Sequence, residues 1–193
     1  MKRVCRAMAG LAILCSVAGV AQQPKFKTGN PEKQKVVEEL TYYYEILSYT
    51  PPVPVDLTGP HDLSTPETAA MNMLQAMSSM DYQRWLTLWT PESQEMMRKR
   101  FQELGKGPEL FKNVWSKLFA QQTITLTKRI ETGPYVVVVA TFSPSGGGEP
   151  QDMEFVFTQV KGAWLGSQDL ASDPVLLNWR EPGTVIKRVA RAK

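Results

Sequence analysis

The feature that most constrains the fold of this chain is a change in the spacing of its apolar residues at Gln121. Before this point apolar residues recur every three or four positions, as in residues 70–80, which is the spacing of a helix that buries one face. Beyond it Ile124, Leu126 and Ile130 alternate with threonines, which predicts a strand. Helices followed by strands predict an α+β fold, with the N-terminal helices packed on a curved antiparallel sheet.

Start and stop signals divide the helical part of the chain. The triplets Thr65-Pro66-Glu67 and Thr90-Pro91-Glu92 each offer a hydroxyl cap, a proline suited to the first helical turn and an acid that opposes the positive helix end. Asp81 can cap a short helix between them, and Gly105 can end the helix that follows. The predicted helices span residues 64–79, 82–89, 91–104 and 109–119.

The segment before these helices predicts one more helix and a connector. Residues 31–49 carry apolar side chains such as Leu40 and Leu47 at helical spacing. Prolines are frequent in residues 51–60, so we expect an extended connector that runs across the surface.

The strand region has one segment that is apolar at nearly every position, residues 135–142. Such a run predicts a central strand that is covered on both faces. Residues 153–160 and 164–170 predict a hairpin around Lys161-Gly162, with the glycine supplying a positive φ. A last strand is expected at residues 184–189.

The N-terminus predicts a secretory signal peptide. Lys2, Arg3 and Arg6 precede an uncharged run, residues 7–20, that is too short and too often interrupted by small residues for a spanning helix. We expect cleavage after Ala21 and export, to the periplasm or the medium.

Both cysteines, Cys5 and Cys15, lie in this signal, so the mature chain has no thiol for a disulfide, a nucleophile or a thiolate metal site. Lipidation at Cys15 is not expected, because Leu14 stands where lipoprotein signals have a small residue. The predicted parts are the signal peptide (1–21), an N-terminal helix and proline-rich connector (22–63), an α+β core domain (64–172) and a C-terminal extension with a basic tail (173–193).

The charge of the mature chain argues against nucleic acid as a partner. The whole chain has 22 Lys and Arg against 19 Asp and Glu, and the signal peptide holds the excess. A formally neutral chain lacks the positive field that drives phosphate binding. The basic residues near the C-terminus, Lys187 to Lys193, suggest membrane contact that is at most peripheral.

Several motifs together resemble the nuclear transport factor 2-like superfamily, a cystatin-like α+β cone. They are the proline-capped block at residues 65–70, the short helix opened by Asp81-Tyr82, the segment 85–90 and the turn Gly162-Ala163-Trp164. The resemblance covers residues 64–170. It implies helices packed on a curved sheet around a cone-shaped cavity, and it implies almost nothing about function.

The enzymatic branches of that superfamily do not carry over to this chain. Ketosteroid isomerase-like members use a buried Tyr and Asp pair with a carboxylate base, whereas Tyr82 and Asp81 are adjacent here and no second acid is evident. Scytalone dehydratase-like members need histidines in the cavity, and the single histidine, His61, lies in a proline-rich loop. We therefore predict no catalytic residues.

The residues that we consider for ligand binding are mostly aromatic. Tyr82, Trp85, Trp89 and Trp115 can line a cavity for an apolar ligand, although aromatic residues at this spacing more often form a core. Glu154 interrupts an apolar strand, where burial would raise its pKa, but its place beside a glycine-rich loop favours solvation.

No metal or cofactor is predicted. One histidine without thiols cannot build the usual zinc site, and methionines such as Met73 and Met77 fit a buried helix stripe better than a copper site. The glycine-rich loops and catalytic signatures of common enzymes are missing from the sequence.

Three functions remain open at this point. The first is an exported, non-enzymatic domain that binds a small apolar ligand in a pocket or a protein partner, with a homodimer through the sheet face as one option. The second is a cavity enzyme (an isomerase, dehydratase or hydrolase) that acts on a hydrophobic molecule through Glu154, Tyr82 or Asp81. The third is an accessory of envelope assembly or lipid handling.

Overall fold

The computed structural model describes residues 43–105 and 107–180 of the chain. Strand β1 (Glu45–Pro54) is followed by four helices and then by the other four strands and a short helix. The helices are α1 (Pro66–Ser78), α2 (Tyr82–Thr87), α3 (Pro91–Leu104), α4 (Glu109–Phe119) and α5 (Pro174–Asn178). The strands after α4 are β2 (Gln122–Thr132), β3 (Tyr135–Pro144), β4 (Gln151–Val160) and β5 (Ala163–Gly166). The α+β class is confirmed.

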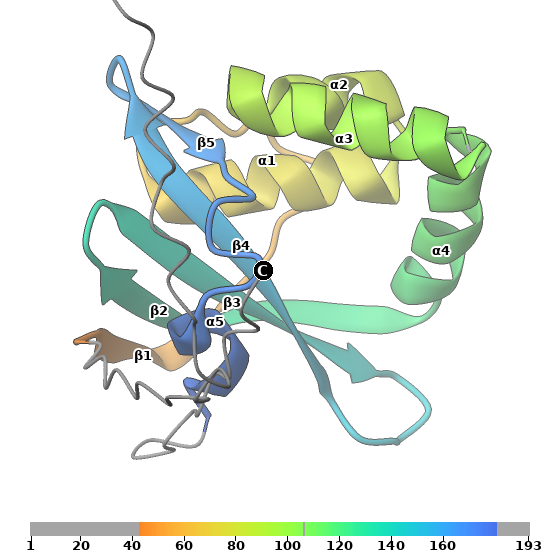
Figure 1. Cartoon of the computed structure of the whole chain (residues 1–193). Helices are drawn as coiled ribbons and strands as arrows, with labels where there is room; N and C mark the ends of the chain where they lie inside the picture. Colours follow the sequence, from red (N-terminus) through yellow and green to blue (C-terminus); the bar gives the residue numbers. More distant parts are fainter. Residues whose placement is uncertain (1–42, 106, 181–193) are drawn as a thin grey trace, which may run out of the picture. The chain divides into compact units, whose positions relative to one another are not determined.

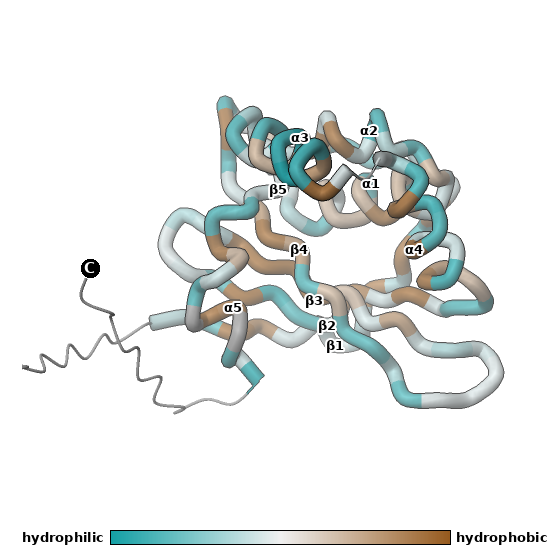
Figure 2. Tube along the Cα trace, turned by 45° about the vertical axis from the view of Figure 1, so that its right-hand side comes forward, coloured by the Kyte–Doolittle hydropathy of each residue, from teal (hydrophilic) through white to brown (hydrophobic). Residues whose placement is uncertain are grey.

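The five strands form one antiparallel sheet in the order β1-β2-β3-β4-β5. Helices α1 to α4 lie on one side of this sheet and α5 lies on the other (Figures 1 and 2). We call the two sides of the sheet the helical face and the outer face.

The predicted helix caps are present. The side chains of Thr65 and Thr90 accept hydrogen bonds from backbone N–H groups three residues later, and each is followed by a proline in the first turn. Asp81 caps α2 through the N–H of Arg84, at 3.0 Å. Gly105 ends α3 in the left-handed region, with φ of 59°.

Strand β3 is buried on both faces, as its composition predicts. Val136, Val138 and Ala140 face the helices, while Val137 and Val139 face the other way, and all five are nearly inaccessible to solvent. The cover of the outer face comes partly from the C-terminal segment, whose Val175 and Trp179 belong to the outer cluster.

The alternation in β2 was predicted wrongly beyond Leu126. Ile124 and Leu126 belong to the helical-face core, but Ile130 belongs to the outer cluster. The register shifts between Leu126 and Lys128, because Thr127 is an extra residue without a partner in the pairing with β3. An extra residue of this kind reverses the faces of the residues that follow it.

The predicted helix at residues 31–49 is wrong for its last part. Residues 45–49 belong to β1, which pairs antiparallel with β2, and residues up to 42 lie outside the described part of the chain. Part of the expected connector, residues 51–54, also belongs to this strand. Prolines are tolerated there because β1 lies at an edge of the sheet.

The hairpin around Lys161-Gly162 is confirmed, but its second strand is shorter than predicted. Strand β5 ends at Gly166, which forms an isolated bridge with Trp89 in the segment between α2 and α3. Gly166 accepts a hydrogen bond from the N–H of Thr90 and donates one to the carbonyl of Leu88, both at 2.8 Å. The expected strand at residues 184–189 lies outside the described residues.

Gly166 is predicted to be intolerant of a side chain. A methyl group there would collide with the end of Met73 and lie 2.9 Å from the ring of Trp89. We expect Gly166→Ala to lower the free energy of unfolding by about 1–3 kcal/mol, measured by chemical denaturation. Gly146→Ala is the control, since a methyl group at that loop position meets nothing within 4 Å. Equal stability of the two variants would contradict the close approach.

Candidate functional site

Four of the predicted site residues come together in an aromatic cluster on the helical face. Trp85 is its centre, with ring centroids 5.7 Å from Tyr82, 5.2 Å from Trp89 and 5.4 Å from Trp115. Phe111 on α4 contacts three of these rings. All four predicted residues are at least nine-tenths buried, and burial raises the pKa of the Tyr82 hydroxyl above its ordinary value. The rings pack against one another as core residues do.

Glu154, the fifth predicted residue, lies away from this cluster. It pairs with Val139 of β3, whose side chain belongs to the outer face. Its carboxylate accepts a hydrogen bond from the indole N–H of Trp179 at 3.2 Å and forms an ion pair with Arg180. The structure therefore does not bring all five predicted residues into one site, and ligand binding at any of them stays a prediction.

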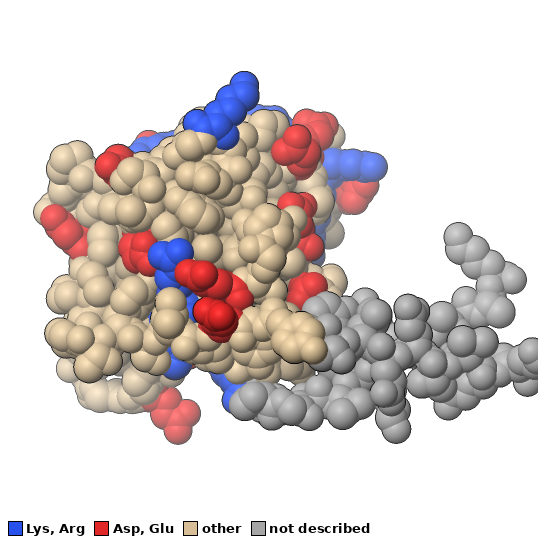
Figure 3. All heavy atoms as spheres, turned by 90° about the vertical axis from the view of Figure 1, so that its left-hand side faces the viewer, with Lys and Arg blue, Asp and Glu red and all other residues tan. Residues whose placement is uncertain are grey.

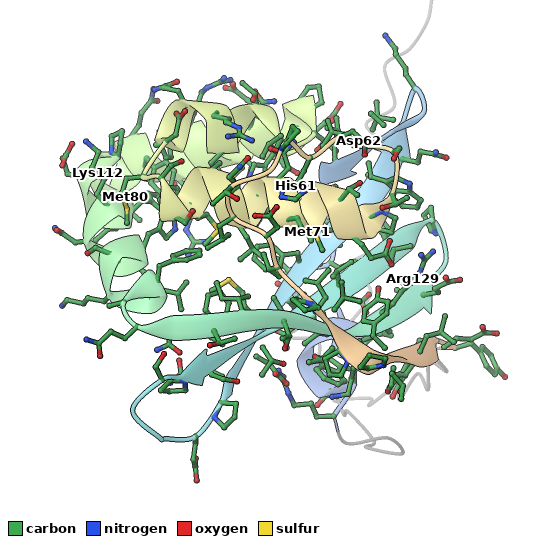
Figure 4. All side chains as sticks on the ribbon, turned by 180° about the vertical axis from the view of Figure 1, so that it is seen from behind. His61, Asp62, Met71, Met80, Lys112 and Arg129 are labelled. Carbon is green, nitrogen blue, oxygen red and sulfur yellow. The ribbon has the colours of Figure 1, made fainter. Side chains whose placement is uncertain are left out.

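His61 lies beside α1 (Figure 4). Its Nε2 atom contacts the carbonyl oxygen of Asp56, and its own carbonyl accepts a hydrogen bond from Asn72 of α1 at 3.0 Å. Among residues 43–105 and 107–180, no group of three or more His, Cys, Asp or Glu side chains is placed to hold a metal ion.

An open pocket lies elsewhere, at the end of the sheet where β2 turns into β3 and β4 turns into β5. Its volume is about 360 Å³. We call it the hairpin pocket, and its lining residues are Arg129, Glu131, Gly133, Pro134, Tyr135, Val136, Thr158, Gln159 and Trp164. Figure 3 shows the side of the molecule that carries this end of the sheet, and acidic and basic side chains gather there within a mostly uncharged surface. None of the five predicted site residues lines this pocket.

Arg129 is the best-fixed charged group of the hairpin pocket. Its Nε atom donates to Glu131 at 2.8 Å and its Nη1 atom donates to Glu67 at 3.2 Å. Glu67 in the first turn of α1 also accepts a hydrogen bond from the hydroxyl of Tyr49 on β1. The Arg129 side chain thus ties the start of α1 to the sheet (Figure 4), and no described residue accepts a hydrogen bond from its Nη2 atom.

The protonation states in this group follow from its contacts. Burial alone would raise the pKa of Glu67, but the Tyr49 hydrogen bond and the charge of Arg129 together bring that pKa below its ordinary value. Burial, followed by the hydrogen bond to Glu67, raises the pKa of Tyr49 above its ordinary value. At neutral pH the carboxylate is therefore ionised and the phenol is protonated.

The two aromatic residues at the pocket point to opposite faces of the sheet. Trp164 on β5 packs against the helical-face core, whereas the ring of Tyr135 on β3 packs against the outer cluster and its hydroxyl donates a hydrogen bond to Asp169 at 2.9 Å. That bond raises the pKa of Tyr135. On the helical face the opening combines the Trp164 ring with a guanidinium, a carboxylate and an amide, which suits binding by stacking and hydrogen bonds.

The hairpin pocket was missed by the sequence analysis. One available signal was Arg129 and Glu131, two oppositely charged residues that are two positions apart in a predicted strand and so share a face. Their orientation toward the helices depends on the extra residue at Thr127, which the sequence pattern does not reveal. Glu67 was identified only as a helix-start residue, and no local pattern connects it to Arg129.

A second cavity, of about 230 Å³, lies near the start of β2. It is lined by Lys117, Leu118, Gln122, Phe142, Pro144 and Gln151. It contains one cationic side chain and no tryptophan or tyrosine, so it offers fewer recognition groups than the hairpin pocket.

The comparison with known proteins finds no matching family model, no matching curated protein and no matching solved structure. None of the helices within residues 43–105 and 107–180 combines the length and the apolar character needed to cross a membrane.

The ion pair of Glu67 predicts a specific dependence of stability on pH. Because the folded-state pKa of Glu67 lies below its ordinary value of 4.5, the carboxylate stabilises the fold above about pH 4.5, and this contribution is lost as the pH falls through the folded-state pKa. We expect the free energy of unfolding of the wild type to fall more between about pH 6 and about pH 3 than that of Glu67→Gln.

The control for this experiment is Glu95→Gln, because the Glu95 side chain is 78% exposed and its ion pair with Arg98 is 3.8 Å long. This variant should keep the pH profile of the wild type. Identical profiles for the wild type and Glu67→Gln would show that the Glu67 ion pair does not stabilise the fold.

Proposed function

We propose that this chain is an exported, non-enzymatic binding domain that holds a small molecule in the hairpin pocket. The observation that carries the proposal is the pocket itself, whose volume of about 360 Å³ lies within the range of ligand sites. Its lining combines the apolar ring of Trp164 with a few polar groups, of which Arg129 is fixed by other side chains, as in sites that orient a ligand.

The protonation states near the pocket favour binding over proton transfer. A general acid or base works best when its pKa is close to the working pH. The pKa of Glu67 is shifted further below that range, and the pKa of Tyr49 is shifted further above it. The enzyme alternative has less support, since Asp81 caps α2 and Glu154 lies on the face of the sheet opposite Tyr82.

The resemblance to the nuclear transport factor 2-like cone remains part of the proposal. Four helices on one face of a five-stranded antiparallel sheet, with an opening at one end, are consistent with that fold. A homodimer through the outer face has less support, because Val175 and Trp179 pack on that face. A peripheral envelope or lipid role has no support from the described residues.

Export predicts a defined N-terminus. In a bacterial host that secretes proteins, we expect the full chain to be recovered outside the cytoplasm with Gln22 as its first residue, as determined by mass spectrometry. Ala21→Leu should accumulate as the precursor, because signal cleavage requires a small residue at that position, whereas Ser16→Leu within the apolar run should be processed. A lipid-modified N-terminus at Cys15, or an uncleaved cytoplasmic wild type, would contradict this prediction.

Ligand binding is tested by native mass spectrometry of the mature protein purified from its own host. We expect the wild type to retain a small molecule that Gln159→Trp has lost, because the larger side chain fills the pocket from its exposed rim. Gln102→Trp makes the same change on the exposed surface of α3 and should retain the molecule. Equal retention by both variants would place the ligand elsewhere, and an empty wild type would argue against the binding function.

A further inference from the structure

We propose that the molecule held in the hairpin pocket is a neutral carbohydrate, an inference that rests on the proposed binding function and names its ligand class. One aromatic ring faces the opening from the helical side of the sheet, that of Trp164 on β5, which pairs directly with Gln159 of β4. The C–H groups of a sugar ring form apolar patches that can pack on an aromatic face while the hydroxyl groups point outward.

This ring is held before a ligand arrives. Trp164 packs against the helical-face core, and its backbone N–H donates to the carbonyl of Leu63 at 2.8 Å. A stacking surface that is already ordered loses little side-chain entropy on binding, which favours a weakly interacting ligand such as a sugar.

The polar lining is suited to neighbouring hydroxyl groups. Arg129, Glu131 and Gln159 carry planar groups, each with two or more donor or acceptor positions, and such groups can bond two adjacent hydroxyls at once. Arg129 is oriented by Glu67 and Glu131, while its Nη2 atom has no hydrogen-bond acceptor among the described residues. Gln159 is exposed at the rim and makes no side-chain hydrogen bond to the described residues.

The charges of the pocket argue for a neutral ligand. The guanidinium of Arg129 is already paired with the two carboxylates of Glu67 and Glu131, so an anion would meet uncompensated negative charge. A cation would meet the guanidinium in the same wall. An apolar molecule would remove water from these polar groups without replacing their hydrogen bonds. A neutral molecule with many hydroxyl groups avoids all three costs.

The test is an NMR titration of the mature protein, observed at the indole N–H signals. Trp164→Phe assigns the signal of Trp164 among the five tryptophans. The neutral probes are cellobiose, lactose, mannobiose and chitobiose, and the comparison probes are glucuronate, glucosamine and 1-naphthol. We expect at least one neutral disaccharide to shift the Trp164 signal saturably, and glucuronate and glucosamine to shift it less at the same concentration.

Two variants distinguish recognition in the pocket from contact elsewhere. Gln159→Ala removes hydrogen bonds at the rim without touching the core, and we expect it to raise the dissociation constant about fivefold. Gln102→Ala on α3 is the matched control and should bind as the wild type does. Equal affinity of both variants would remove Gln159 from the site and overturn the proposed hydroxyl recognition.

The outcomes separate this inference from the proposed function. If only a charged or apolar probe shifts Trp164, or if the molecule retained in native mass spectrometry is not a carbohydrate, the carbohydrate inference is overturned and the binding function stands. If no probe shifts Trp164 and the purified protein is empty, both are overturned. A saturable shift with a neutral disaccharide that weakens in Gln159→Ala supports both.

Discussion

The extra residue at Thr127 decides which side chains of β2 meet the helices, and the hairpin pocket depends on it. Leu126 pairs with Ala140 on the helical face, whereas Lys128 pairs with Val139 and lies over Trp179 on the outer face. Every later residue of the strand is reversed relative to a regular alternation. Arg129 can therefore reach Glu67 at the start of α1, while the apolar Ile130 fills the outer cluster. One inserted position thus sets both the core and the pocket.

The two-sided burial of β3 is the second constraint. A central strand with valines on both faces must be covered twice, and short connections within the sheet leave few segments to do so. Helices α1 to α4 cover one face, and the segment with α5 packs on the other through Val175 and Trp179. At the far edge, Gly166 allows β5 to approach Trp89 and Met73 closely. Trp164, two residues earlier, is consequently held at the mouth of the pocket.

Structural features that depend on neighbouring residues were predicted correctly from the sequence, whereas features that depend on contacts between distant residues were not. The caps at Thr65, Asp81 and Thr90 were predicted because a cap is a short-range hydrogen bond with a recognisable residue pattern. Residues 45–49 were assigned to a helix because their apolar spacing fits one, but pairing with β2 outweighs that local preference. The aromatic cluster was expected from helical spacing, whereas the pocket requires Glu67 and Arg129 to meet across 62 positions.

The aromatic cluster and the hairpin pocket differ in how much side-chain surface they leave for a ligand. In the cluster each large ring has other rings as neighbours, so its surface is already used in packing and contributes to stability. At the pocket, Trp164 is anchored from behind by the helical-face core and leaves part of its surface at the opening. Arg129 is held in a similar way, because the carboxylates of Glu131 and Glu67 accept hydrogen bonds from its Nε and Nη1 atoms. Its Nη2 atom has no acceptor among the described residues. Fixed groups with unused binding capacity are what recognition requires, and the described part of the chain combines aromatic, cationic and acidic groups of this kind at the hairpin pocket.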